Sequence, residues 1–144
     1  MSDEPSNTAS ERLRKSVAVL NDGVPPEGLV RTWLADDFVY EDRRRGPSFP
    51  NADAESYPKL LGTAWETGVG QPRLQHEILG VRGERFAAAV VTLDYGNGML
   101  FESIHLLALD AALRLVQRVV DFDVDDVEGA NVELDRLYSG ADGS

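Results

Sequence analysis

The sequence predicts an α+β fold built on a mostly antiparallel sheet. Helical patterns and one short strand fill the first half of the chain, whereas four consecutive strands and a final helix fill the second half. Strands that follow one another through tight turns pair antiparallel, and separate helices then cover the sheet. The strands predicted at 86–95 and 99–109 are apolar on both faces. We therefore expect both faces to be covered, one by the helices and one by a second subunit or by the final helix.

The two N-terminal helices are predicted from spacing and from their end signals. Apolar residues recur at helical spacing after Ser10, and the sequence Asn-Asp-Gly at 21–23 ends this helix. A second short helix opens with Pro25-Pro26, because proline lacks only an amide hydrogen that would be unpaired in a first turn. This helix carries Trp33 and ends at Asp36-Asp37.

The middle of the chain contains a strand, a loop and a third helix. Residues 38–42 alternate as a strand, and the stretch 43–51, with its glycine and prolines, forms a loop. The third helix is capped by Asp53 or Ser56. Its apolar stripe consists of Tyr57, Leu60, Leu61, Ala64 and Trp65.

The second half of the chain is predicted as a meander of four strands. These strands span residues 74–81, 86–95, 99–109 and 115–122, and the Gly-Asn-Gly sequence at 96–98 is a strong hairpin turn. A final amphipathic helix, capped by Asp123 or Asp125, runs through Leu137.

The length of the chain predicts the extent of the domain, and its charge limits the classes of partner. The 144 residues correspond to one domain, which we expect to span residues 10–138 between flexible tails at 1–9 and 139–144. The net charge of −11 repels phosphate backbones and anionic membrane surfaces, so we expect neither nucleic acid nor a membrane as partner. Residues 1–14 contain no signal core, which predicts a cytoplasmic protein. The absence of cysteine excludes disulfides and thiolate chemistry.

The motif Ala-Asp-Asp-Phe-Val-Tyr-Glu-Asp at 35–42 resembles the nuclear transport factor 2-like superfamily. This superfamily includes ketosteroid isomerases, limonene epoxide hydrolases and SnoaL-like polyketide cyclases. The order of the predicted elements also resembles that of the family, from about Ser10 to Tyr138. The resemblance implies a cone-shaped fold in which N-terminal helices cover a curved, mostly antiparallel sheet and a C-terminal helix follows. It also implies a homodimer, with Leu100, Ile104 and Leu106 as an apolar back face for pairing.

The resemblance also implies a site. The aspartate that ends the first strand is the general base of ketosteroid isomerases, and Asp42 matches this position. His105 matches the position of an oxyanion donor, and Arg118 and Phe122 match positions that line the pocket. The family's catalytic tyrosine falls near Ala18, which has no hydroxyl, so the resemblance implies a pocket without steroid isomerase activity.

The residues themselves leave two interpretations of each predicted catalytic group. Asp42 shares a strand face with Tyr40, and burial there would raise its pKa and suit it to proton transfer. Alternatively, Asp42 is a strand-end residue that binds the turn 43–45. His105 lies on an otherwise apolar strand face and is either a cavity residue or a hydrogen-bonded core histidine.

The remaining candidates have alternatives of the same kind. Arg118 either faces inward and pairs with Asp42, or faces outward and pairs with Glu102. Asp121 falls on the opposite strand face from Arg118 and is expected at an interface or at the rim of the cavity. The arginines at 43–45 either bind an anion or form a solvated turn. Residues predicted to line the cavity, or to belong to the core, are Trp33, Tyr40, Tyr57 and Trp65.

The resemblance implies a cavity for a small, largely apolar molecule, and we expect no cofactor. The chain has only two histidines, and His76 has no second histidine at ligand spacing, so we expect no metal. In the leading hypothesis Asp42 and His105 perform cofactor-free proton transfer, and Asp42→Asn or His105→Ala abolishes turnover without unfolding the protein. The alternatives are a non-catalytic ligand-binding or regulatory module and a dimerisation scaffold with a filled interior.

Overall fold

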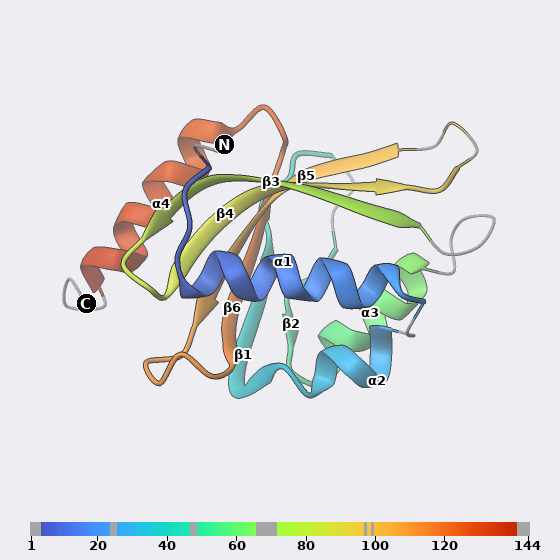
Figure 1. Ribbon diagram of the computed structural model, residues 1–144, viewed down its shortest axis with the longest axis horizontal. Helices are drawn as coiled ribbons and strands as arrows, with labels where there is room; N and C mark the ends of the chain where they lie inside the picture. Colours follow the sequence, from blue (N-terminus) through green and yellow to red (C-terminus); the bar gives the residue numbers. More distant parts are fainter. Residues whose placement is uncertain are drawn as a thin grey trace.

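One six-stranded sheet organises the protein in the computed structural model, which describes residues 4–23, 26–46, 49–65, 72–96, 98 and 100–140 (Figure 1). The strand order is β2-β1-β6-β5-β4-β3. The strands β1 and β6 pair in parallel, whereas the other neighbours pair antiparallel. In chain order the elements are α1 (Thr8–Asn21), α2 (Pro26–Arg31), β1 (Leu34–Asp42), β2 (Ala52–Asp53), α3 (Ser56–Trp65), β3 (Arg73–Arg82), β4 (Phe86–Asp94), β5 (Leu100–Leu109), β6 (Val116–Phe122) and α4 (Val127–Gly140).

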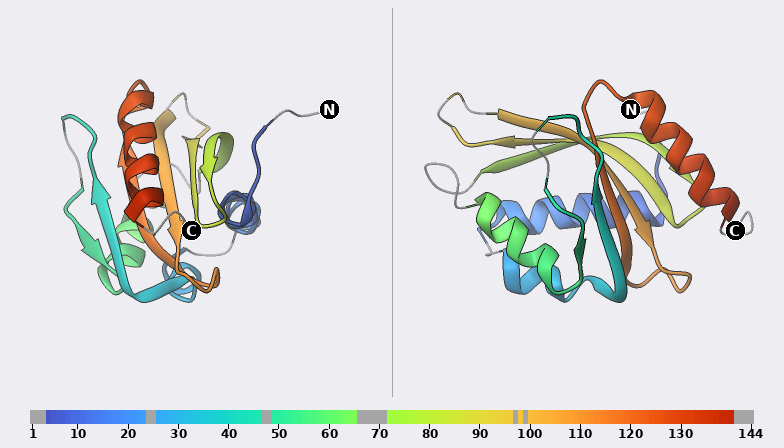
Figure 2. Two further views of the ribbon diagram at one scale, coloured as in Figure 1. Left: turned by 90° about the vertical axis from the view of Figure 1, so that its left-hand side faces the viewer. Right: turned by 180° about the vertical axis from the view of Figure 1, so that it is seen from behind.

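The helices cover both faces of the curved sheet. The helix α1 crosses one face with α2 and α3 near one of its ends, and α4 packs on the opposite face (Figures 1 and 2). Successive residues of β5 show the division, since Leu107 joins the core beneath α1–α3 whereas Leu106 joins the core beneath α4. The α+β fold predicted from the sequence is therefore confirmed, including its C-terminal helix.

The helix α1 begins at Thr8, two residues before the predicted start. Asn7 and Ser10 form a reciprocal capping box, in which the Asn7 side chain accepts a hydrogen bond of 2.8 Å from the Ser10 amide. The Asn7 amide group also donates to the carbonyls of Gly83 and Phe86 at 2.8 and 2.9 Å. The packed structure thus starts before the predicted boundary at residue 10.

The strand β1 is longer than predicted, and its first residues were expected in a helix. The apolar spacing that favoured a helix through Leu34 is overridden by pairing, because Leu34 lies opposite Val116 and the Val116 amide donates to the carbonyl of Trp33 at 2.8 Å. A second difference is the two-residue strand β2, which follows the predicted loop directly and pairs with Val39 and Tyr40.

The helix α4 occupies the surface that was expected to bind a second subunit. Ile104 and Leu106 are fully buried in the core that contains Ala130 and Leu134 of α4. Of the predicted apolar back face, only Leu100 is exposed. The prediction that Ile104 and Leu106 form a dimer surface is therefore wrong, because the chain's own last helix buries them.

The N-terminal cap of α4 also differs from the prediction. Asp126 accepts a hydrogen bond from the Gly129 amide at 3.0 Å, whereas Asp123 and Asp125 bind the side chain of Arg45. None of the described helices combines the length and hydrophobicity needed to cross a bilayer.

Candidate functional site

A cavity of about 180 Å³ lies between α1, α2, α3 and the face of the sheet that they cover. For comparison, an engineered cavity of about 150 Å³ lined by apolar side chains binds benzene. The volume therefore suits a molecule with a single ring. The exposed side chains of Phe49, Phe101 and Glu102 line the outer part, so the cavity opens to solvent there.

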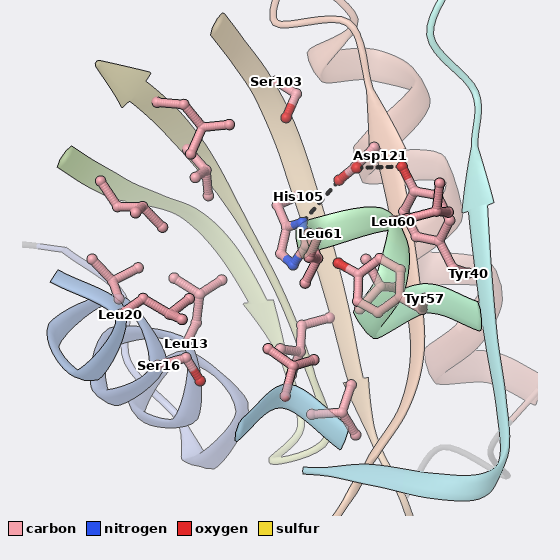
Figure 3. Close-up of a pocket in the computed structure, with 18 of the residues that line it drawn as sticks. Leu13, Ser16, Leu20, Tyr40, Tyr57, Leu60, Leu61, Ser103, His105 and Asp121 are labelled. Atoms are coloured by element: carbon pink, nitrogen blue, oxygen red, sulfur yellow. Dashed lines mark hydrogen bonds and ion pairs between the residues drawn. The ribbon is translucent and has the colours of Figure 1, made fainter. Parts of the chain in front are cut away.

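The lining of the cavity is divided along the sheet. The adjacent strands β1, β6 and β5 contribute the polar side chains Tyr40, Asp121 and His105. On the other side, β3, β4 and α1 contribute mainly aliphatic side chains, such as Leu13 and Leu20 (Figure 3). A bound molecule would consequently meet polar groups at one end and hydrocarbon at the other.

Three polar side chains form a hydrogen-bonded chain in the cavity wall. His105 Nδ1 lies 2.8 Å from Asp121 Oδ1, and the Tyr40 hydroxyl donates to Asp121 Oδ2 at 2.7 Å (Figure 3). The register explains the first contact, since His105 and Asp121 are direct partners on β5 and β6 and project from the same face. Because a carboxylate only accepts hydrogen bonds, Asp121 holds the proton of neutral His105 on Nδ1.

The second ring nitrogen of His105 is available to the cavity. No described residue hydrogen-bonds to Nε2, and the His105 side chain retains 22% of its exposure. In the tautomer imposed by Asp121, Nε2 carries a lone pair and can accept a proton. A carboxylate-oriented imidazole in a mostly apolar cavity can thus act as a general base.

Tyr57 brings a hydroxyl from α3 to the same place. It is buried, packs 4.7 Å from the Tyr40 ring, and directs its hydroxyl toward His105 (Figure 3). Within the described part of the chain this hydroxyl has no hydrogen-bond partner. Burial, and then the nearby charge of Asp121, raises the pKa of both Tyr57 and Tyr40, so both remain protonated donors at neutral pH.

Asp42 lies outside this arrangement. Its carboxylate is fully buried and accepts hydrogen bonds from Arg44 Nε and Nη2 at 2.9 and 2.7 Å, from the Arg44 amide at 3.1 Å, and from the Phe49 amide at 2.8 Å. Burial raises the pKa of Asp42, but the hydrogen bonds from Arg44 and Phe49 outweigh it and lower the pKa below its ordinary value. The predicted pairing of Asp42 with His105 is therefore wrong, and Asp42 holds the turn that follows β1.

Arg118 and Phe122 were expected in the cavity but lie on the other face of β6. Phe122 packs in the core beneath α4, and Arg118 pairs with Glu41 at 3.0 Å, not with Asp42 or Glu102. The expectation that Asp121 belongs to an interface or rim is also wrong, because Asp121 lines the cavity.

The aromatic candidates and the arginine triplet can also be placed. Trp33, Tyr40 and Tyr57 line the cavity as expected, whereas the side chain of Trp65 lies outside the described part of the structure. Of the arginines at 43–45, Arg44 lines the cavity, whereas its neighbours bind acids elsewhere. No local signal could have found Asp121, because counting across the hairpin between β5 and β6 places Val120 opposite His105.

Comparison with known proteins supports the fold. No family model and no curated protein matches the sequence. Among solved structures, the chain is similar to a SnoaL-like family protein from Agrobacterium tumefaciens strain C58 for which isomerase activity is suggested (15% identity, TM-score 0.58, 80% of this chain and 96% of that one). It is also similar to a protein from Xanthomonas campestris pv. campestris for which polyketide cyclase activity is suggested (13% identity, TM-score 0.55, 80% and 89%).

A third similar structure belongs to a designed protein. It is a de novo designed protein with a curved β-sheet, which shares 15% identity with this chain at a TM-score of 0.60 over 95% of this chain and 99% of the designed one. At such low identities the likeness concerns the arrangement of the backbone. The chain therefore has the nuclear transport factor 2-like fold of SnoaL-like proteins.

Proposed function

We propose that this protein binds a small, largely apolar molecule and catalyses a cofactor-free proton transfer on it. The observation that carries the proposal is the hydrogen-bonded chain of His105, Asp121 and Tyr40 in the wall of a mostly apolar cavity. A base oriented in this way can remove a proton from a carbon acid. The removal becomes easier when nearby hydrogen-bond donors stabilise the negative charge that develops on the substrate.

The proposed reaction begins at a carbon next to a carbonyl group. His105 Nε2 removes a proton from that carbon, the C–H electron pair forms the enolate, and the negative charge develops on the carbonyl oxygen. Asp121 stabilises the imidazolium, and the Tyr57 hydroxyl donates to the oxygen. Return of the same proton to a different carbon completes an isomerisation, so no oxidant, metal or cofactor is consumed. Exclusion of water strengthens each of these electrostatic contacts.

The test uses 3-cyclohexen-1-one, a one-ring ketone of suitable size whose isomerisation to the conjugated ketone is followed by ultraviolet absorbance. We expect catalysis above the buffer rate by the wild-type protein. General base catalysis contributes about 10²- to 10⁴-fold, so His105→Gln should lower the rate to a similar extent, and Asp121→Asn should also lower it. The matched control is His76→Gln, which removes the other histidine, a β3 residue outside the cavity lining.

Two results would overturn the proposal. The first is wild-type protein that binds the ketone, as seen by NMR, but isomerises it no faster than buffer and exchanges none of its α-protons with deuterated solvent. This outcome would leave a non-catalytic binding protein. The second is a rate that survives both His105→Gln and Asp121→Asn while circular dichroism shows that both variants are folded.

A further inference from the structure

Arg44 is a cation held rigidly in the wall of a largely apolar cavity. One edge of its guanidinium is fixed by two hydrogen bonds to the Asp42 carboxylate, which is itself fully buried. The ring of Phe49 lies 5.5 Å from the guanidinium carbon. These contacts remove most of the freedom of a long side chain, so little entropy remains to be lost when a ligand binds.

The other edge of the guanidinium has hydrogen-bond donors to spare. A guanidinium carries five N–H groups, and Asp42 uses one on Nε and one on Nη2. The remaining three have no acceptor among the residues that the structure describes. Donors arranged as a planar fork match the two oxygens of a carboxylate.

The charges around the Arg44 guanidinium favour the binding of a monoanion over that of a dianion. The hydrogen bond and charge of Asp42, and then the charge of Asp121, raise the pKa of Arg44, so two carboxylates already lie near this cation. A phosphate with two charges would be repelled by both. A carboxylate adds a single charge and is therefore repelled less.

The polar and aliphatic sides of the cavity determine the chemistry and size of the part of the ligand that lies beyond its carboxylate. His105 and Tyr57 lie on the polar side of the cavity, opposite the mainly aliphatic side chains of α1, β3 and β4 (Figure 3). Arg44 also lines the cavity. With about 180 Å³ available, the apolar part is limited to roughly one ring.

We infer that the molecule that occupies the cavity is a one-ring carboxylic acid, bound as the carboxylate by the free edge of Arg44. The inference rests on the proposed function in one respect, since it takes the cavity to be a binding site. It goes beyond that function because it assigns the ligand class and a specificity-determining residue outside the proton-transfer chain.

The test compares two probes of nearly equal shape by isothermal titration calorimetry. Cyclohexanecarboxylate carries the charge, and cyclohexanecarboxamide lacks it. We expect the carboxylate to bind wild-type protein at least about 10-fold more tightly, since charged hydrogen bonds contribute more than neutral ones. Arg44→Lys keeps a cation for Asp42 but removes the fork, and it should abolish most of this preference. The control is Arg45→Gln, which removes the next arginine, an exposed residue that binds Asp123 and Asp125 outside the cavity.

The outcomes separate this inference from the proposed function. Equal affinity of wild-type protein for the two probes, or binding of neither, overturns the inference. A carboxylate preference that Arg44→Lys leaves unchanged in a folded variant overturns it as well. Isomerisation of the neutral ketone by wild-type protein is measured separately and reports on the function alone, because this probe carries no carboxylate. Arg44→Gln is less suitable, because it leaves the buried Asp42 carboxylate without its cation.

Discussion

Replacing Asp42 by asparagine should destabilise the fold rather than remove a catalytic base. Asparagine has the same shape but keeps only one acceptor oxygen, and its amide group would face the donors on Arg44 Nη2 and on the Phe49 amide. Two of the four hydrogen bonds to the carboxylate are then lost. Hydrogen bonds to charged groups contribute about 1.5–3 kcal/mol each. Because Arg44 is partly exposed and can turn to water, we expect a total loss of about 3 kcal/mol.

The measurement is urea unfolding followed by tryptophan fluorescence at pH 7. The variant should show a lower midpoint with an unchanged slope, since the surface exposed on unfolding stays the same. The matched control is Asp125→Asn, which makes the same substitution in an exposed carboxylate paired with the exposed Arg45. This control should leave the midpoint unchanged.

The pH dependence of the difference provides a second check. Because the pKa of Asp42 is lowered in the folded protein, its carboxylate stabilises the fold above the unfolded pKa of about 3.9 and loses this effect as the pH falls through the lower, folded value. The stability difference between wild type and Asp42→Asn should therefore be constant from pH 5 to 8, by the same principle, and shrink below about pH 4. A variant as stable as wild type, yet inactive on the cyclohexenone probe, would refute the structural role and restore Asp42 as a catalytic group.

Two further substitutions test the packing that positions the site. Asn7→Ala removes the cap of α1 and two hydrogen bonds to the β3–β4 turn and β4, so the free energy of unfolding in urea should fall by about 2–3 kcal/mol. A decrease no larger than that of Ser6→Ala would contradict this role. Leu134→Ala leaves a cavity in the core beneath α4 and should lower the free energy of unfolding by about 3 kcal/mol. Val132→Ala, at an exposed position of the same helix, should change the free energy of unfolding little. Equal effects of the two substitutions would show that α4 does not pack as described.

Local patterns predicted most elements because those elements are determined locally. Helical spacing, proline and glycine placement, and the hairpin turns lie within a few residues of the structure they specify. The first four residues of β1 were missed, since their apolar spacing is compatible with a helix and only pairing of Leu34 with Val116 makes them a strand. The start of α1 was placed late because the contacts of Asn7 with Gly83 and Phe86 are distant in sequence.

The site was predicted only in part, and a single inserted residue explains the errors on β6. Alternation correctly placed Asp121 and Arg118 on opposite faces of β6, but the wrong face was taken as the inner one. The register between β5 and β6 shifts between Ala108 and Leu109, where Arg118 and Val116 are the respective partners. Without this bulge at Gln117, Val120 would lie opposite His105; with it, Asp121 does. A shift of one residue exchanges the two faces of a strand, and nothing in the sequence marks this one.

The parallel pairing of β1 with β6 also decides when the site can exist during synthesis. Tyr40 and Asp121 are 81 residues apart, yet they share a hydrogen bond through neighbouring strands. Closing so long a loop is entropically costly, and contacts of this kind slow folding. A nascent chain that lacks residues 116–122 can form the β3–β4–β5 meander, but it has neither Asp121 nor the strand that joins β1 to that meander. The polar wall therefore cannot form until β6, which carries Asp121 16 residues after His105, has been translated.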